Sequence, residues 1–112
     1  MIYAKFIESN EKINRFILSG HAESGPFGHD LVCAASSALA IGTTNNLYRI
    51  LSNPPIVEAN EIEGGYLNLR LPDKLANKET QQAKLLLESL YYSLLDVEAE
   101  HGEHITVSMI KE

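Results

Sequence analysis

Apolar and polar residues alternate in several short segments of the chain, which is the pattern of a β-strand with one buried face. Residues 2–7 and 13–18 show this pattern on either side of a polar stretch, so they predict a β-hairpin. Residues 56–62 and 66–71 flank Gly64 and Gly65, which form a turn signal. These two segments therefore predict a second hairpin.

Two longer segments predict helices. The first should begin after Asp30, a residue type favoured as a helix N-cap, and should end near Leu51, because the Asn-Pro-Pro that follows cannot continue a helix. Small residues dominate its first three turns, which lets another backbone come close. Two neighbouring stripes run along it at helical spacing: Val32, Ala35, Leu39, Gly42, Asn46 and Ile50, and beside them Cys33, Ser37, Ala40, Thr44 and Tyr48.

The second helix is expected from about Asn77 to Glu100. Its core stripe consists of Leu86, Leu87, Leu90, Leu94 and Val97. Further apolar residues widen this surface beyond one face: Leu85, Tyr91, Tyr92 and Leu95. A helix that is apolar over more than half of its girth in so small a protein has a second face to bury, which favours a homodimer.

Residues 105–110 alternate once more and predict a closing strand. The element order over residues 1–112 is therefore β-β-α-β-β-α-β, with no internal repeat or linker, and indicates one domain. Hairpins that alternate with single helices predict an α/β (α+β) fold: a two-layer sandwich in which a mixed, mostly antiparallel sheet carries both helices on one face.

Charge and composition narrow the function. The formal net charge is −6 and no Lys/Arg cluster is evident along the sequence, so direct nucleic-acid binding is not expected, whereas a basic peptide or protein partner suits the charge. No apolar run approaches the ~20 residues of a membrane span. The chain begins with a strand pattern rather than a secretion signal, so we expect a cytoplasmic protein with no membrane association.

The candidate chemistry gathers around the single cysteine, Cys33. A thiol attacks carbonyl groups as a thiolate, and its pKa falls at a helix N-terminus or beside a histidine. With Asp30 as the N-cap, Cys33 would be the third helical residue, close to N–H groups that could stabilise an oxyanion. His21 lies twelve residues upstream at the end of a predicted strand, so the chain can bring it back to Cys33.

Other interpretations of the same residues are more ordinary. A lone cysteine is most often a small buried residue, and an N-cap aspartate needs no catalytic role. A mixed zinc site built from His21, His29, Asp30 and Cys33 is possible in principle, but these residues lack the paired short spacings of structural zinc sites. We therefore expect neither a metal nor a cofactor.

The segment between the two candidate residues contains Gly25, Pro26 and Gly28 and has no periodicity, which predicts a loop over residues 22–29. Such a loop could act as a lid or could simply be irregular.

The sequence around Cys33 resembles the ribosomal-processing cysteine protease family, Prp. The resemblance rests on Gly20-His21-Ala22, a short loop, and the run GHDLVCAASSAL from Gly28 to Leu39. It extends to the length of the chain and to the predicted order of elements. The family implies a cysteine endopeptidase without a cofactor that removes the N-terminal extension of a large-subunit ribosomal protein during ribosome maturation.

The resemblance also implies roles for individual residues. It makes Cys33 the nucleophile and His21 its general base, with Asp30 and Ser37 as supporting residues and Gly20 as the residue that gives the lid loop its freedom. Family members are homodimers, and their substrate is a basic ribosomal protein peptide. The alternative is a non-catalytic, dimeric module of the same fold that binds peptides or associates with ribosomes.

Overall fold

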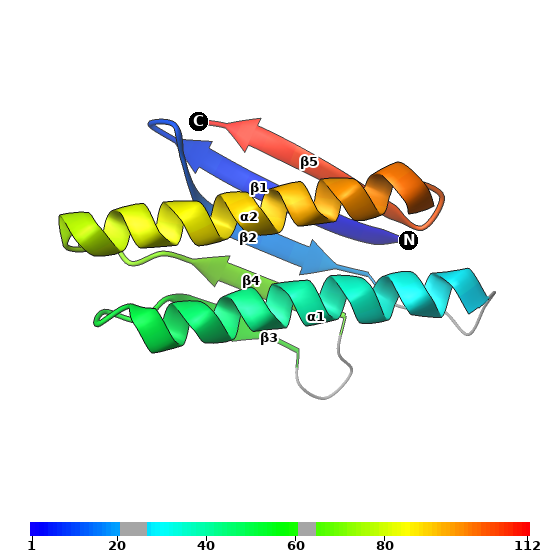
Figure 1. Cartoon of the computed structure of the whole chain (residues 1–112), viewed down its shortest axis with the longest axis horizontal. Helices are drawn as coiled ribbons and strands as arrows, with labels where there is room; N and C mark the ends of the chain where they lie inside the picture. Colours follow the sequence, from blue (N-terminus) through cyan, green and yellow to red (C-terminus); the bar gives the residue numbers. More distant parts are fainter. Residues whose placement is uncertain (21–26, 61–64) are drawn as a thin grey trace.

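The computed structural model of the chain describes residues 1–20, 27–60 and 65–112, without the side chains of residues 27–30. Its sheet has five strands in the spatial order β3-β4-β2-β1-β5 (Figure 1). Their bounds are Ile2–Ser9 for β1, Lys12–Ser19 for β2, Ile56–Ala59 for β3, Tyr66–Arg70 for β4 and Ile105–Lys111 for β5. β1 and β5 pair in parallel and the other neighbours pair antiparallel, which confirms the predicted mixed, mostly antiparallel sheet.

The first hairpin forms where the alternation predicted it. Asn10 and Glu11 make its turn with φ angles of 52° and 64°, which gives the turn the right-handed twist of the strands beside it. The two strands pair from Tyr3–Ser19 to Ser9–Lys12, so both run slightly longer than the apolar residues alone indicate. β3 and β4 form the second predicted hairpin, and residues 61–64 of its connection lie outside the described residues.

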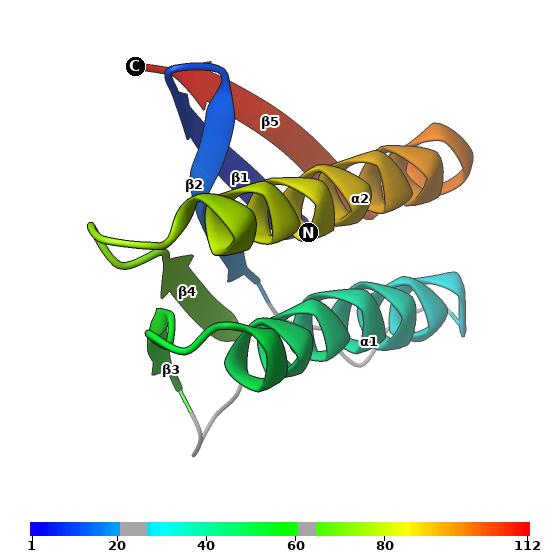
Figure 2. The ribbon, with the colours of Figure 1, turned by 60° about the vertical axis from the view of Figure 1, so that its left-hand side comes forward.

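Both helices cover one face of the sheet and run antiparallel to each other (Figures 1 and 2). α1 spans Phe27–Ile50 and α2 spans Asn77–His101. The predicted two-layer sandwich is therefore correct, and α2 ends within one residue of its expected position. No helix among the described residues is long and apolar enough to cross a membrane.

The start of α1 differs from the prediction. The helix begins at Phe27, three residues before Asp30, so the N-cap position assigned to Asp30 was wrong. Gly28, which we assigned to a loop over residues 22–29, is helical. Glycine costs a helix only about 1 kcal/mol relative to alanine, a cost that tertiary packing can override. One glycine was therefore too weak a signal to end the helix.

The core lies between the sheet and the two helices. Phe6 is fully buried at its centre, with ring centroids 5.9 Å from Phe16 and 5.1 Å from Tyr91. From α2 the buried residues are Ala83, Leu87, Leu90 and Leu94, while Leu86 and Val97 of the predicted stripe are partly buried. The exposed residues include Leu85 and Tyr92, which belong to the wider apolar surface of this helix.

Neither predicted stripe of α1 is the buried one. The buried residues are Val32, Ser36, Ala40, Thr44 and Leu47, whereas Asn46, Tyr48 and Ile50 are exposed. The buried line takes Val32, Ala40 and Thr44 from the two predicted stripes and adds Ser36 and Leu47, which belong to neither. In a helix composed largely of Ala, Ser, Thr and Gly, hydrophobicity distinguishes poorly between neighbouring faces.

We expect Phe6→Ala to lower the free energy of unfolding by about 3–5 kcal/mol, because it removes a buried ring and leaves a cavity. Urea denaturation followed by circular dichroism measures this loss. Tyr92→Ala is the matched control, since Tyr92 is 60% exposed and its truncation should cost well under half as much. Equal losses in the two variants would show that Phe6 is not central to the core.

Candidate active site

A cavity of about 280 Å³ lies between the N-terminal half of α1 and the end of the sheet where β2 finishes. Cys33 contributes to its wall together with Ser36, Ser37 and Ile41 of the same helix. The opposite wall comes from the strands and the residues next to them: Ile2, Leu18, Gly20, Ala59, Asn60, Gly65, Tyr66 and Leu67. Cys33 therefore lines a largely apolar cavity with a few polar groups. Binding sites for small ligands usually have this character.

Cys33 is half-buried and packs against the hydrophobic core. Its place on α1 follows from the helix period, because Val32 next to it is buried and Ser37, four residues later, is exposed on the same side. The cysteine is thus held by a rigid element at the border between core and solvent. A nucleophile needs such a position, since it must be both fixed in place and accessible to substrate.

Gly20 brings the chain to this cavity in a conformation that only glycine adopts readily. Its φ is +113°, and a Cβ at this position would collide with the carbonyl oxygen of Met1. Its N–H donates a hydrogen bond of 2.9 Å to the carbonyl of Gly65. The backbones of β1, β2 and β4 are therefore in close contact beside the cavity. This packing is a different requirement from the loop freedom that the resemblance implied for Gly20.

The structure brings together three of the residues named from the sequence, namely Cys33, Ser37 and Gly20. His21 and Gly25 lie outside the described residues. Asp30 belongs to α1, and its side chain is outside the description. The residues that meet at the cavity come from the segments 18–20 and 33–41, from Ile2, and from residues 59–60 and 65–67 on either side of the undescribed connection.

The early start of α1 changes the expected electrostatics of Cys33. Cys33 is the seventh residue of the helix rather than the third, so it lies beyond the first turn, where unpaired N–H groups and the helix dipole act most strongly. Activation of the thiol by the helix terminus, which the sequence suggested, therefore loses its geometric basis. A neighbouring base becomes the more important requirement.

Sequence reasoning missed two contributions to the cavity. The sequence indicated Ser36 only as one of several small residues of the helix. It lines the cavity together with Cys33, and only 1% of it is exposed. The β3–β4 hairpin contributes Asn60 and Tyr66, and no local pattern linked this hairpin to the cysteine. Only the strand order, which places β4 next to β2, could have indicated it.

The absence of a metal stays a prediction, although no group of three or more His, Cys, Asp or Glu side chains among the described residues is arranged to hold a metal ion. Of the four zinc ligands considered from the sequence, only the side chain of Cys33 belongs to that part of the chain.

Comparisons with known proteins identify the family of the chain. Residues 1–106 match the family model described as cysteine protease Prp. The chain belongs to the cysteine protease Prp family. The ribosomal processing cysteine protease Prp of Bacillus subtilis is 32% identical over 109 residues, which cover 96% of each chain.

Solved structures of the family have the same fold. The Prp protease of Staphylococcus aureus with a covalently linked product peptide is similar with a TM-score of 0.81 and 33% identity, over 97% of this chain and 99% of that one. The same protease with a substrate peptide gives a TM-score of 0.82 and 29% identity, over the same shares of the two chains. The Prp fold predicted from the resemblance is confirmed, and the chain is a cysteine protease by family.

We expect Gly20→Ala to destabilise the protein by about 1–3 kcal/mol through backbone strain, in addition to the collision with Met1. Gly42→Ala on α1 is the control, because an added Cβ there meets nothing within 4 Å and alanine is the better helix former, so this variant should be neutral or stabilising. Thermal unfolding of both variants gives the answer. A melting temperature for Gly20→Ala equal to that of Gly42→Ala would contradict the described conformation at Gly20.

Proposed function

We propose that the protein is a cysteine endopeptidase that removes the N-terminal extension of a large-subunit ribosomal protein, with Cys33 as nucleophile and His21 as general base. The observation that carries the proposal is the cavity that Cys33 shares with Gly20 and Ser37. Gly20 lines this cavity and His21 is the next residue in the sequence. Peptide-bound structures of a protease with the same fold support a peptide substrate.

The mechanism that follows is acyl transfer. His21 takes the proton of the Cys33 thiol, and the thiolate attacks the scissile carbonyl carbon to form a tetrahedral intermediate. Collapse of this intermediate breaks the peptide bond, while His21 gives its proton to the leaving amine. Water, activated by the same histidine, then hydrolyses the thioester and restores Cys33. Asp30 and Ser37 belong to the proposal as supporting residues, and Gly25 as part of the segment that admits the peptide.

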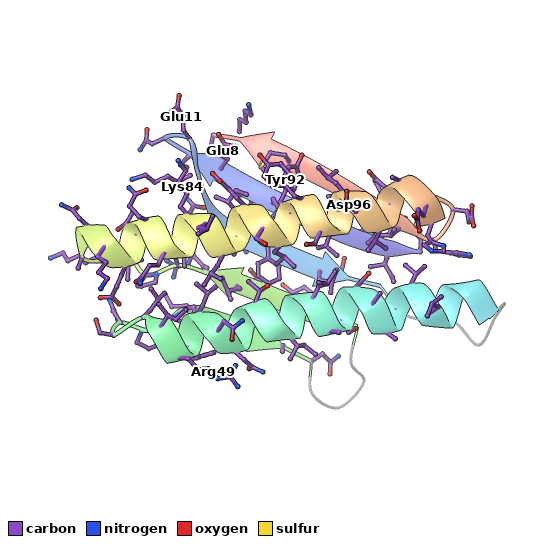
Figure 3. The ribbon with its side chains drawn as sticks, in the orientation of Figure 1. Glu8, Glu11, Arg49, Lys84, Tyr92 and Asp96 are labelled. Carbon is purple, nitrogen blue, oxygen red and sulfur yellow. The ribbon has the colours of Figure 1, made fainter. Side chains whose placement is uncertain are left out.

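Charge near the site supports a basic substrate. Asp96 and Glu100 of α2 line a groove of about 390 Å³ that they share with Leu31, Val32 and Ala35 of α1. This groove reaches the turn of α1 that carries Cys33. Figure 3 shows Asp96 toward the end of α2 that lies beside the start of α1, with Lys84 and Arg49 toward the other end of the helix pair. The two carboxylates of this groove would attract a cationic peptide to the part of α1 that carries Cys33. Such a substrate places the enzyme in the cytoplasm, where ribosomes are assembled.

We expect Cys33→Ala to abolish cleavage and His21→Ala to reduce it by about 10²–10⁴-fold, because loss of a general base costs this much. The substrate is the N-terminally extended ribosomal protein of the same organism, and intact mass gives the products. A single cut near the N-terminus by the unmodified protein, absent in the Cys33→Ala variant, would support the protease and locate the cleavage site.

Alkylation of Cys33 by iodoacetamide tests the activation of the thiol without a protein substrate, so it distinguishes an inactive enzyme from a wrongly chosen substrate. An activated Cys33 reacts quickly in the native protein. It does so even at a pH below about 8.5, the pKa of an ordinary cysteine thiol. The reaction should slow in the His21→Ala variant. Absence of cleavage together with an unreactive Cys33 would contradict the protease and favour the non-catalytic peptide-binding module.

We also propose that the protein is a homodimer that pairs through α1. Six of the exposed residues of this helix follow the 3-4 spacing of a coiled-coil seam: Leu31, Ala34, Ala38, Ile41, Asn45 and Tyr48. Small residues at its middle let a second helix approach closely. Ile41 belongs both to this seam and to the wall of the cavity, so a partner on α1 would border the site. The exposed Leu85 of α2 belongs to the competing surface, which the sequence favoured.

Light scattering after size exclusion can decide between the two helices. We expect Ala38→Glu to give a monomer, because it buries like charges against each other across the pair. Leu85→Glu, on the exposed face of α2, should remain a dimer. The opposite pattern would place the interface on α2, and a monomer before any substitution would remove the dimer altogether.

A further inference from the structure

The hydroxyl of Ser36 is the feature of the cavity that the proposed chemistry does not use. Ser36 lies on α1 three residues after Cys33, and 1% of it is exposed. Among the described residues its Oγ is the buried side-chain oxygen or nitrogen atom with no hydrogen-bond partner. A buried polar group in this condition costs free energy, so its presence calls for a physical reason.

Other hydroxyls of the same helix show that a partner is available in principle. Thr43 Oγ1 donates to the carbonyl oxygen of Leu39, and Thr44 Oγ1 donates to that of Ala40, each at 2.8 Å. The equivalent acceptor for Ser36 is the carbonyl oxygen of Val32, four residues earlier. Ser36 does not make this bond. It is also the one of these three hydroxyl residues that lines the Cys33 cavity.

We propose that Ser36 is a substrate-binding residue, whose hydroxyl makes a hydrogen bond to a main-chain peptide group of the substrate held in the Cys33 cavity. This inference rests on the proposed peptidase function. The walls of the cavity are mainly apolar, with Leu18, Ile41 and Leu67 among them, so they suit an apolar side chain. The peptide backbone beside that side chain loses water when it enters, and its polar groups then need partners.

The energetics favour this use of a buried hydroxyl. A typical hydrogen bond contributes little to binding, because both partners give up hydrogen bonds to water. Ser36 is shielded from bulk solvent before substrate arrives, and it has no protein bond to break. The hydroxyl therefore loses its water when the enzyme folds and not when substrate binds. The hydrogen bond to substrate can then add to the free energy of binding. A serine at this position trades some stability of the free enzyme for substrate binding.

The proposal predicts that Ser36→Ala separates stability from binding. The melting temperature should stay unchanged or rise, because the substitution removes an unsatisfied polar group. The KM for a synthetic peptide that spans the cleavage site should rise by about three- to tenfold, the factor that one hydrogen bond supplies, while kcat changes less. Thr44→Val is the matched control, since it removes a buried hydroxyl that is already bonded within α1. It should lower the melting temperature and leave KM unchanged.

Binding without chemistry completes the test. In the Cys33→Ala background, fluorescence anisotropy with the same labelled peptide should show a Kd that rises by the same factor when Ser36→Ala is added. Equal KM and Kd with and without the Ser36 hydroxyl would overturn this inference and leave the peptidase intact. A lower melting temperature for Ser36→Ala would also overturn it, because it would show that the hydroxyl is bonded in the free enzyme. If the unmodified sequence neither cleaves nor binds the peptide, the proposed function fails and this inference fails with it.

Discussion

The pairing of β1 with β2 is the constraint on which the rest of the protein depends. These strands are neighbours in the sheet. β5 pairs with the free edge of β1 and β4 pairs with the free edge of β2, so the rest of the sheet extends from this hairpin on both sides. Their shared face places Phe6 and Phe16 under the helices and gives the core its centre. The same ladder carries the chain to Gly20, where the approach of two backbones leaves no space for a side chain. Core and cavity thus depend on one register.

The site follows from how two layers meet at the end of this ladder. α1 presents Cys33 from one side, and the end of β2 with the β3–β4 hairpin forms the other wall. The packing of helix against sheet forms most of the cavity, and Gly20, Asn60 and Gly65 complete its wall from the connections beside the strands. In the proposed mechanism the burden of activating the thiol shifts to His21, because Cys33 lies beyond the first turn of its helix. In the same proposal, Asp96 and Glu100 of α2 contribute to the attraction of a basic substrate rather than to bond cleavage.

The sequence predicted the elements, their order and the two-layer architecture, because alternation and helical spacing are strong signals in β1, β2 and α2. It failed where physical contrast is low. The buried line of α1 contains Ser36 and Thr44, which hydrophobicity does not distinguish from exposed serines and threonines. The start of α1 was misplaced because Asp30 is a favoured N-cap type and because Gly25, Pro26 and Gly28 together indicated a loop, whereas the helix already begins at Phe27. The cavity partners from the β3–β4 hairpin depend on strand order, which no short motif carries.

The parallel pairing of β1 with β5 has a consequence for synthesis of the protein. Ile2 pairs with Ile105, so the earliest strand of this sheet to leave the ribosome has an uncovered outer edge until the latest strand of the sheet is made. Until then, β1 is an open edge that carries Phe6 and two more core residues, Ile2 and Ala4. Such an edge is a template for wrong pairing between chains. A nascent chain therefore completes this sheet only after residues 105–111 have been made, and the sheet is most vulnerable to aggregation just before that point.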